Sequence, residues 1–146
     1  MPVALVRERR LPWHRRLVPL VVVGIARLLA RAKPVRVRQA LELARRGSVP
    51  ATAEQALTAR QHVVSVSLRC AGQACLQRSI AVALLCRIRG TWPTWCTGVR
   101  VNPFAAHAWV EVAGEPIGEP YPPGHYRALL TVPPQMSHPG TQSAPH

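Results

Sequence analysis

A helical segment followed by strand-like segments constrains the fold of this 146-residue chain more than any other feature. Residues 75–87 carry apolar side chains at the i, i+4 spacing that places them on one helix face, and Gly90 ends the segment. Residues 94–101 and 107–112 alternate with the two-residue period of strands, and residues 127–132 are expected to add a last strand. This order predicts an α+β fold in which a central helix packs against an antiparallel meander.

Three more helices are expected ahead of this core, over residues 17–32, over residues 37–46 and from Thr52 onward. The first should stop before Pro34, because the residue before a proline avoids helical geometry. Thr52 and Gln55 have the spacing of a capping box, which marks a helix start. The chain is expected to divide into a basic flexible tail, a helical N-terminal part, a core and a disordered tail, over residues 1–14, 15–68, 69–133 and 134–146.

The chain is strongly basic, with 19 Lys and Arg residues against 6 Glu, no Asp and a formal charge of +13. Such a charge is typical of proteins that bind nucleic acid, a membrane surface or an acidic peptide. The basic residues are scattered, however, and nearly all are Arg, which equally fits a generally basic surface encoded by a GC-rich genome. The chain also lacks the motifs of nucleic-acid-binding proteins, so we expect no nucleic-acid partner.

An apolar run from Leu17 to Ala26 follows several arginines, as in a signal peptide. No small-residue cleavage site clearly follows, and ten residues are too few for a helix to span a bilayer. We expect this run to belong to a buried amphipathic helix of a cytoplasmic protein. Membrane contact through residues 17–30 is the less favoured alternative.

Cysteines stand at positions 70, 75, 86 and 96 without a C-x-x-C pair, so we expect neither a zinc site nor a cofactor. Cys86 and Cys96 are expected to be small core residues. Cys75 differs because it opens a helix, where free N–H groups and the helix dipole favour a thiolate. His107 opens a strand and is the candidate base for this thiol, although each residue alone also fits a structural role.

A base of this kind is usually oriented by a carboxylate, which must be Glu here because the chain has no Asp. Glu119 follows His107 across the turn at Gly114, and a hairpin there would bring the two together. Strand parity requires an odd loop, residues 113–115, or a bulge to put Glu119 on the face of His107. Glu111 and Asn102 remain rivals for this third role.

Four blocks carry a resemblance to a known family: Cys75-Leu76-x-Arg78-Ser79, Trp92-Pro93-x-Trp95-Cys96-x-Gly98-Val99-Arg100, Pro103-Phe104-x-Ala106-His107-Ala108-Trp109-Val110-Glu111-Val112 and Gly118-Glu119-Pro120. The Cys, His, acid order is that of transglutaminase-like cysteine proteases. Over residues 36–133 the sequence resembles the lasso peptide biosynthesis leader peptidase, in its stand-alone actinobacterial form. Cys75 then matches the family nucleophile, His107 the base and Glu119 the acid, which is Asp in many transglutaminase-like enzymes.

The resemblance implies a cysteine peptidase with a transglutaminase-like, papain-like core over residues 69–133. It would remove the leader from a ribosomally made precursor peptide, ahead of ring closure by a separate macrolactam synthetase. A small leader-recognition protein would present the precursor. An acyl-transferring enzyme on the same fold is the alternative, because fold does not decide between water and an amine as acceptor; a basic nucleic-acid-binding protein is the weaker one.

Overall fold

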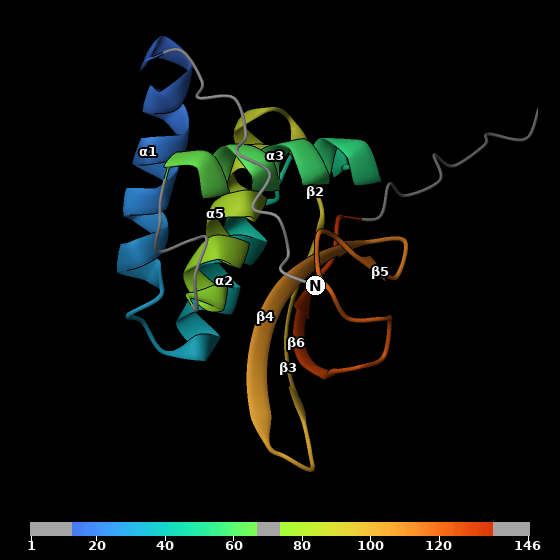
Figure 1. Cartoon of the computed structure of the whole chain (residues 1–146). Coiled ribbons are helices and arrows are strands. Elements are labelled where there is room, and N and C mark those ends of the chain that lie inside the picture. Colours follow the sequence, from blue (N-terminus) through green and yellow to red (C-terminus); the bar gives the residue numbers. More distant parts are fainter. Residues whose placement is uncertain (1–12, 67–73, 136–146) are drawn as a thin grey trace, which may run out of the picture.

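The computed structural model describes residues 13–66 and 74–135, which form four helices and two sheets within these ranges. The helices are α1 (Trp13–Leu29), α2 (Pro34–Ala44), α3 (Ala53–Val66) and α5 (Cys75–Ile88). The strands are β1 (Val49–Pro50), β2 (Thr91–Trp92), β3 (Thr94–Arg100), β4 (Ala105–Val112), β5 (Glu115–Pro116) and β6 (Arg127–Val132). Figure 1 shows α5 lying between α1 and the sheet that contains β3 and β4. The α+β fold expected from the sequence is confirmed.

Helix α5 forms the centre of the molecule. It packs against α1 and α3 on one side and against β4 and β3 on the other. Most of its side chains are therefore buried, including Ile80, Val82 and Leu85, and α1, α2, α3 and the sheet contribute to the same hydrophobic core. The sheet and the surrounding helices thus fix the position of α5, whose first turn lies beside β4.

The larger sheet has the order β5-β4-β3-β6, with antiparallel pairing throughout. The meander expected from the sequence is incomplete, because β6 pairs with β3 instead of following β5. A bulge interrupts the β3–β6 ladder, where Thr97 pairs with Leu130 and Gly98 with Ala128. The parallel pair β1–β2 was not expected, since residues 48–50 have the sequence of a connector.

The sequence signals for the helix ends hold in part: the capping box before α3 is confirmed, whereas α1 ends at Leu29 instead of residue 32 and α2 begins at Pro34 instead of Val37. The backbone N–H of Thr52 donates to Gln55 Oε1 at 2.9 Å, and the N–H of Gln55 donates to Thr52 Oγ1 at 3.1 Å. This reciprocal pair is the predicted capping box, placed just before α3. Pro34 begins α2, a position where the missing proline N–H costs no helical hydrogen bond.

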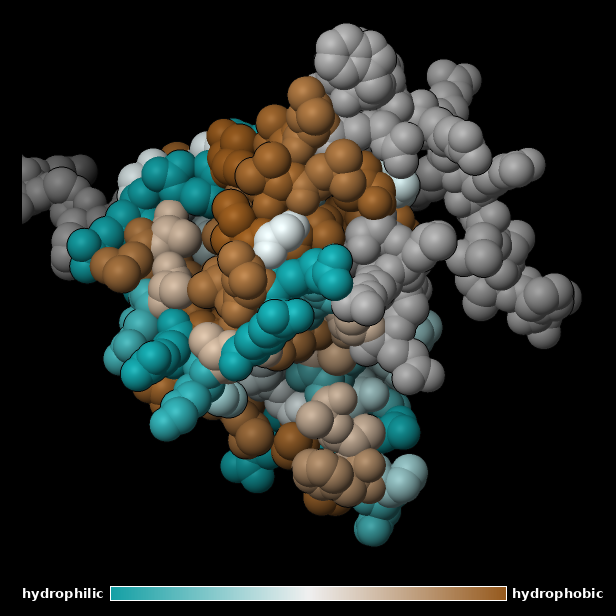
Figure 2. Space-filling model, turned by 90° about the vertical axis from the view of Figure 1, so that its left-hand side faces the viewer, coloured by the Kyte–Doolittle hydropathy of each residue, from teal (hydrophilic) through white to brown (hydrophobic). Residues whose placement is uncertain are grey.

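Helix α1 differs from the buried helix that the sequence predicts. Val22, Val23 and Ala26 face the core, but its other side exposes a row of large aliphatic side chains. Figure 2 shows this side, with hydrophobic residues gathered over much of it. Among the described residues, no helix combines the length and the apolar content needed to cross a membrane.

Candidate active site

Cys75 is the first residue of α5, so its thiol lies beside the unpaired N–H groups of the first helical turn. The preceding residue, Ala74, makes no side-chain hydrogen bond to these groups. The backbone N–H of Ala108 on β4 adds a hydrogen bond to the sulfur. These groups all favour a negative charge on Cys75.

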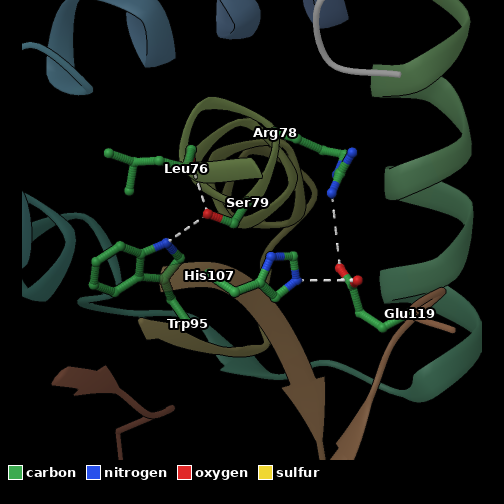
Figure 3. Close-up of polar contacts among 6 residues, drawn as sticks. All are labelled: Leu76, Arg78, Ser79, Trp95, His107 and Glu119. Carbon is green, nitrogen blue, oxygen red and sulfur yellow. Dashed lines mark hydrogen bonds and ion pairs between the residues drawn. The ribbon is translucent and has the colours of Figure 1, made fainter. Parts of the chain in front are cut away.

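A short hydrogen-bond chain fixes the first turn of α5 against β3. The indole N–H of Trp95 donates to Ser79 Oγ at 3.0 Å, and this hydroxyl donates to the carbonyl oxygen of Leu76 at 2.8 Å (Figure 3). Trp95 is fully buried, so its indole has no water as an alternative partner. The chain therefore positions the turn that carries Cys75.

His107 lies on β4 next to the thiol and contacts both Cys75 and Glu119. Its Nε2 is 3.1 Å from Glu119 Oε2, as the sequence predicts (Figure 3). The thiol of Cys75 also interacts with the ring by a hydrogen bond. The structure thus brings Cys75, His107 and Glu119 together in one cluster.

The hairpin that leads toward Glu119 differs from the predicted one. Val112 pairs with Glu115, so the loop contains two residues, Ala113 and Gly114, instead of three. Both have positive φ angles, 52° and 81°, as a type I′ hairpin turn requires. In this register a continued ladder would place Glu119 on the face away from the imidazole, so the predicted three-residue loop was wrong and the chain must leave the ladder before Glu119.

Gly118 redirects the chain after this hairpin. Its φ of +66° belongs to the left-handed region that glycine adopts without strain. A Cβ at this position would lie 2.6 Å from Cδ of Arg60 on α3, so a larger residue would have to displace the arginine side chain as well as adopt a strained backbone conformation. The turn at Gly118, rather than strand parity, brings Glu119 to His107.

Two arginines surround the buried carboxylate of Glu119. Arg78 Nη2 lies 4.0 Å from Oε1, and the two side chains are only 11% and 6% exposed. Burial by itself would raise the pKa of Glu119. The hydrogen bond and charge of His107, followed by the charges of Arg78 and Arg60, outweigh burial and hold that pKa below its ordinary value. Glu119 is therefore ionised at neutral pH.

The pKa values of the thiol and the imidazole shift in opposite directions. The hydrogen bond to His107 is the main cause that lowers the pKa of Cys75 below 9.0, against the opposing effect of burial. Hydrogen bonds from Cys75 and then Glu119 raise the pKa of His107 from 6.5 to about 9. Together these shifts favour a thiolate–imidazolium pair, the reactive form of a nucleophilic cysteine.

The two rival residues for the third role lie elsewhere. Glu111 Oε2 accepts a hydrogen bond from the indole N–H of Trp109 at 3.1 Å. Asn102 is exposed in the turn between β3 and β4 and has a φ of 60°. Of the three candidates, Glu119 is the one placed against His107 in the described part of the chain.

The other described cysteines are structural, as predicted. Cys86 and Cys96 are buried, and burial raises the pKa of their thiols to about 11 and about 12. Cys70 lies outside the described residues. Within those residues, no three His, Cys, Asp or Glu side chains are grouped so that they could hold a metal ion.

Sequence reasoning did not identify the aromatic side chains that cluster around the imidazole of His107. The ring of Tyr126 stacks on His107 with centroids 4.8 Å apart, and Tyr121 meets it edge-on at 6.1 Å. Trp109 lies 5.8 Å away, and His125 stacks on Tyr121 at 4.5 Å. The available signal was that both tyrosines of the chain fall within seven positions of Glu119.

A mostly apolar hollow of about 260 Å³ opens beside the thiol. The bulge in β6 places Leu129, which is 62% exposed, at its edge. Its lining comes from α5, β3, β4 and β6, and consists of Cys75, Leu76, Thr97, Gly98, Val99, Ala106, His107, Ala108 and Leu129. A small or apolar side chain of a peptide could occupy this hollow while its backbone meets the sulfur.

Comparison with known proteins agrees with this geometry. The family model of the transglutaminase-like superfamily matches residues 19–131, which include α5, the sheet and most of the helical part. Members of this superfamily are typically cysteine-dependent enzymes. The searches of curated proteins and of solved structures gave no match. With a thiol at a helix start, an imidazole on a strand and most of its length matched, the chain belongs to the transglutaminase-like superfamily.

Proposed function

We propose that this protein is a cysteine peptidase that removes the leader from a ribosomally made lasso peptide precursor. The observation that carries the peptidase part is the cluster of Cys75, His107 and Glu119, whose pKa shifts favour a thiolate–imidazolium pair. The choice of substrate rests on the four sequence blocks that resemble the leader peptidase family.

The chemistry follows from the positions of these groups. The thiolate of Cys75 attacks the scissile carbonyl carbon and forms a C–S bond, and the first N–H groups of α5 stabilise the resulting oxyanion. The imidazolium of His107 protonates the leaving amine as the C–N bond breaks. Water then attacks the thioester, His107 accepts its proton, and the thiolate leaves. Glu119 holds the imidazole and stabilises its charged form.

The released amine would be the new terminus of the core peptide, the group that a separate macrolactam synthetase needs for ring closure. A small leader-recognition protein would deliver the precursor to the hollow beside Cys75. The proposal places this reaction in the cytoplasm, where ribosomal precursors are made.

The decisive experiment incubates the purified protein with a precursor peptide and its leader-recognition partner, and measures the product masses. We expect two fragments whose masses sum to the precursor plus one water. Cys75→Ala should abolish this cleavage, by a factor of at least roughly 10³. Cys86→Ala and Cys96→Ala are the matched controls, since these thiols are buried away from His107, and they should keep activity in folded protein.

Two outcomes would contradict the proposal. Cleavage by Cys75→Ala would remove the nucleophile assignment. A conjugate with an added amine, in place of two hydrolysis fragments, would identify an acyl transferase on the same fold.

A further inference from the structure

One side of α1 exposes an unusually continuous aliphatic surface. We call it the outer face of α1 and define it by Leu17, Val18, Leu20, Val21, Ile25 and Leu28, together with Ile88 from the end of α5. Positions 17, 21, 25 and 28 are spaced by four, four and three residues, so they follow one stripe along the helix. Figure 2 shows this side of the molecule with its hydrophobic residues gathered together.

The exposure of this stripe is high for side chains of its type. Leu28 is 68% exposed, Val21 61% and Leu17 53%, while Val22 and Ala26 on the opposite side are fully buried. The helix is thus apolar on both sides, although only one side contributes to the core. Contiguous exposed apolar surface on a folded protein marks a site that meets another apolar phase or molecule.

The charges near this surface have one sign. Arg27 and Arg31 are exposed at the C-terminal end of α1, and Arg89 is exposed beside Ile88. The sequence has no acidic residue between positions 13 and 41, and it adds Arg15 and Arg16 at the other end of the helix. Basic residues therefore stand at both ends of an aliphatic stripe that has no negative charge of its own.

We propose that the outer face of α1 binds the surface of an anionic phospholipid bilayer, with the helix lying in the interface plane. Aliphatic side chains would enter the acyl boundary, and the arginines would meet the phosphate groups of the lipid, the arrangement expected of an interfacial helix.

This binding mode leaves the site accessible. Figure 1 places the sheet that carries His107 on the other side of α5 from α1. A bilayer that contacts the outer face of α1 would therefore not cover the hollow beside Cys75. The inference concerns a surface outside the cluster and does not rest on the proposed peptidase activity.

The test is flotation of the full-length protein with vesicles of phosphatidylcholine alone or of phosphatidylcholine mixed with phosphatidylglycerol. We expect binding to the anionic vesicles, weakened by salt, and little binding to the neutral ones. Val21→Gln with Leu28→Gln should reduce the affinity at least about tenfold, because each change removes apolar area that would enter the membrane. Arg27→Gln with Arg31→Gln should weaken the salt-sensitive part of the binding.

The matched control is Leu43→Gln with Leu57→Gln, which changes two exposed aliphatic residues on α2 and α3 and should leave vesicle binding unchanged. Circular dichroism and the alkylation rate of Cys75 check that every variant is folded. The proposal is overturned if monomeric protein ignores anionic vesicles, if it binds neutral vesicles equally well, or if the Val21 and Leu28 variant binds like wild type. A dimer in light scattering that this variant dissociates would instead assign the surface to self-association.

Discussion

At the scale of single residues, the imidazole of His107 is where the interactions of the site converge. It hydrogen-bonds the thiol of Cys75 and the carboxylate of Glu119, and it stacks on Tyr126. Cys75 and Glu119 both favour the charged ring, by hydrogen bonds and by their negative charge, and together they outweigh the opposing effect of burial. The ring is thus held in one orientation and kept protonated at neutral pH.

The first prediction concerns the pH dependence of thiol reactivity. Because the pKa of Cys75 is lowered mainly by its hydrogen bond to His107, alkylation by iodoacetamide should persist well below the range of an ordinary thiol. Reactivity should fall only when the pH drops through this lowered pKa and the thiolate is protonated. In His107→Ala the alkylation midpoint should return toward 9.0, the ordinary pKa of a thiol. An unchanged profile in that variant would mean that the imidazole does not activate the thiol.

A second prediction follows for Glu119. Its hydrogen bond is the second-largest cause that raises the pKa of His107 to about 9. Glu119→Gln should therefore lower that pKa, so the alkaline limb of the cleavage rate, where the imidazolium loses its proton, should move to lower pH. Cleavage should slow on the order of 10²-fold, less than in Cys75→Ala.

Glu111→Gln is the control for this change. Its carboxylate accepts from Trp109 instead of the imidazole, so the variant should keep the alkaline limb of wild type. If the limb moves with Glu111→Gln and stays with Glu119→Gln, the third role belongs to Glu111.

At the scale of elements, the bulge between β3 and β6 shapes the hollow beside the thiol. Gly98 lies at this bulge, and a Cβ there would collide with the backbone carbonyl of Arg127 and lie 3.0 Å from Cη2 of Trp109. The close approach of the two strands therefore requires a residue without a side chain. It is this approach that leaves Leu129 at the edge of the hollow.

The third prediction tests this packing. Gly98→Ala should lower the free energy of unfolding by about 1–3 kcal/mol, because β6 must move to admit the methyl group. Gly24→Ala on α1 is the matched control, since a Cβ there meets nothing within 4 Å. It should raise the free energy of unfolding by roughly 0.5–1 kcal/mol through the better helix propensity of Ala. Urea denaturation of the three proteins measures both effects, and equal stability of Gly98→Ala and wild type would contradict the account of the bulge.

At the scale of the whole molecule, the helical part and the sheet share one hydrophobic core. Buried side chains of α1, α2 and α3 pack with those of α5, β3 and β4, so the described helices take part in forming the site's scaffold. None of the described elements is left as a separate module for binding a leader peptide. In the proposed function, leader recognition is therefore assigned to a separate protein.

The fourth prediction is that the chain alone cleaves precursor slowly and that a small leader-binding protein accelerates it. The partner would raise the local concentration of the precursor at the thiol, so the acceleration should appear mainly as a lower KM. An excess of free leader peptide should abolish this acceleration, because it occupies the partner's binding site for the precursor. Full-rate cleavage by the chain alone at low substrate concentration would contradict this prediction.

The sequence by itself determined the features that depend on short-range patterns. The capping box at Thr52, the start of α5 at Cys75 and the strand that carries His107 all follow from residue spacing within a few positions. Such signals act through neighbouring backbone groups, so they can be recognised without knowing the rest of the fold. The sequence also predicted that Cys75, His107 and Glu119 belong to one cluster.

Only the tertiary structure decided how Glu119 reaches the imidazole and what surrounds it. The predicted three-residue loop was wrong, because the hairpin loop has two residues. Glu119 reaches the imidazole because Gly118 turns the chain against Arg60, a contact between residues 58 positions apart. The aromatic cluster around His107 and the exposed outer face of α1 likewise depend on which elements pack against which. Those contacts join distant parts of the chain, and no periodicity within one segment encodes them.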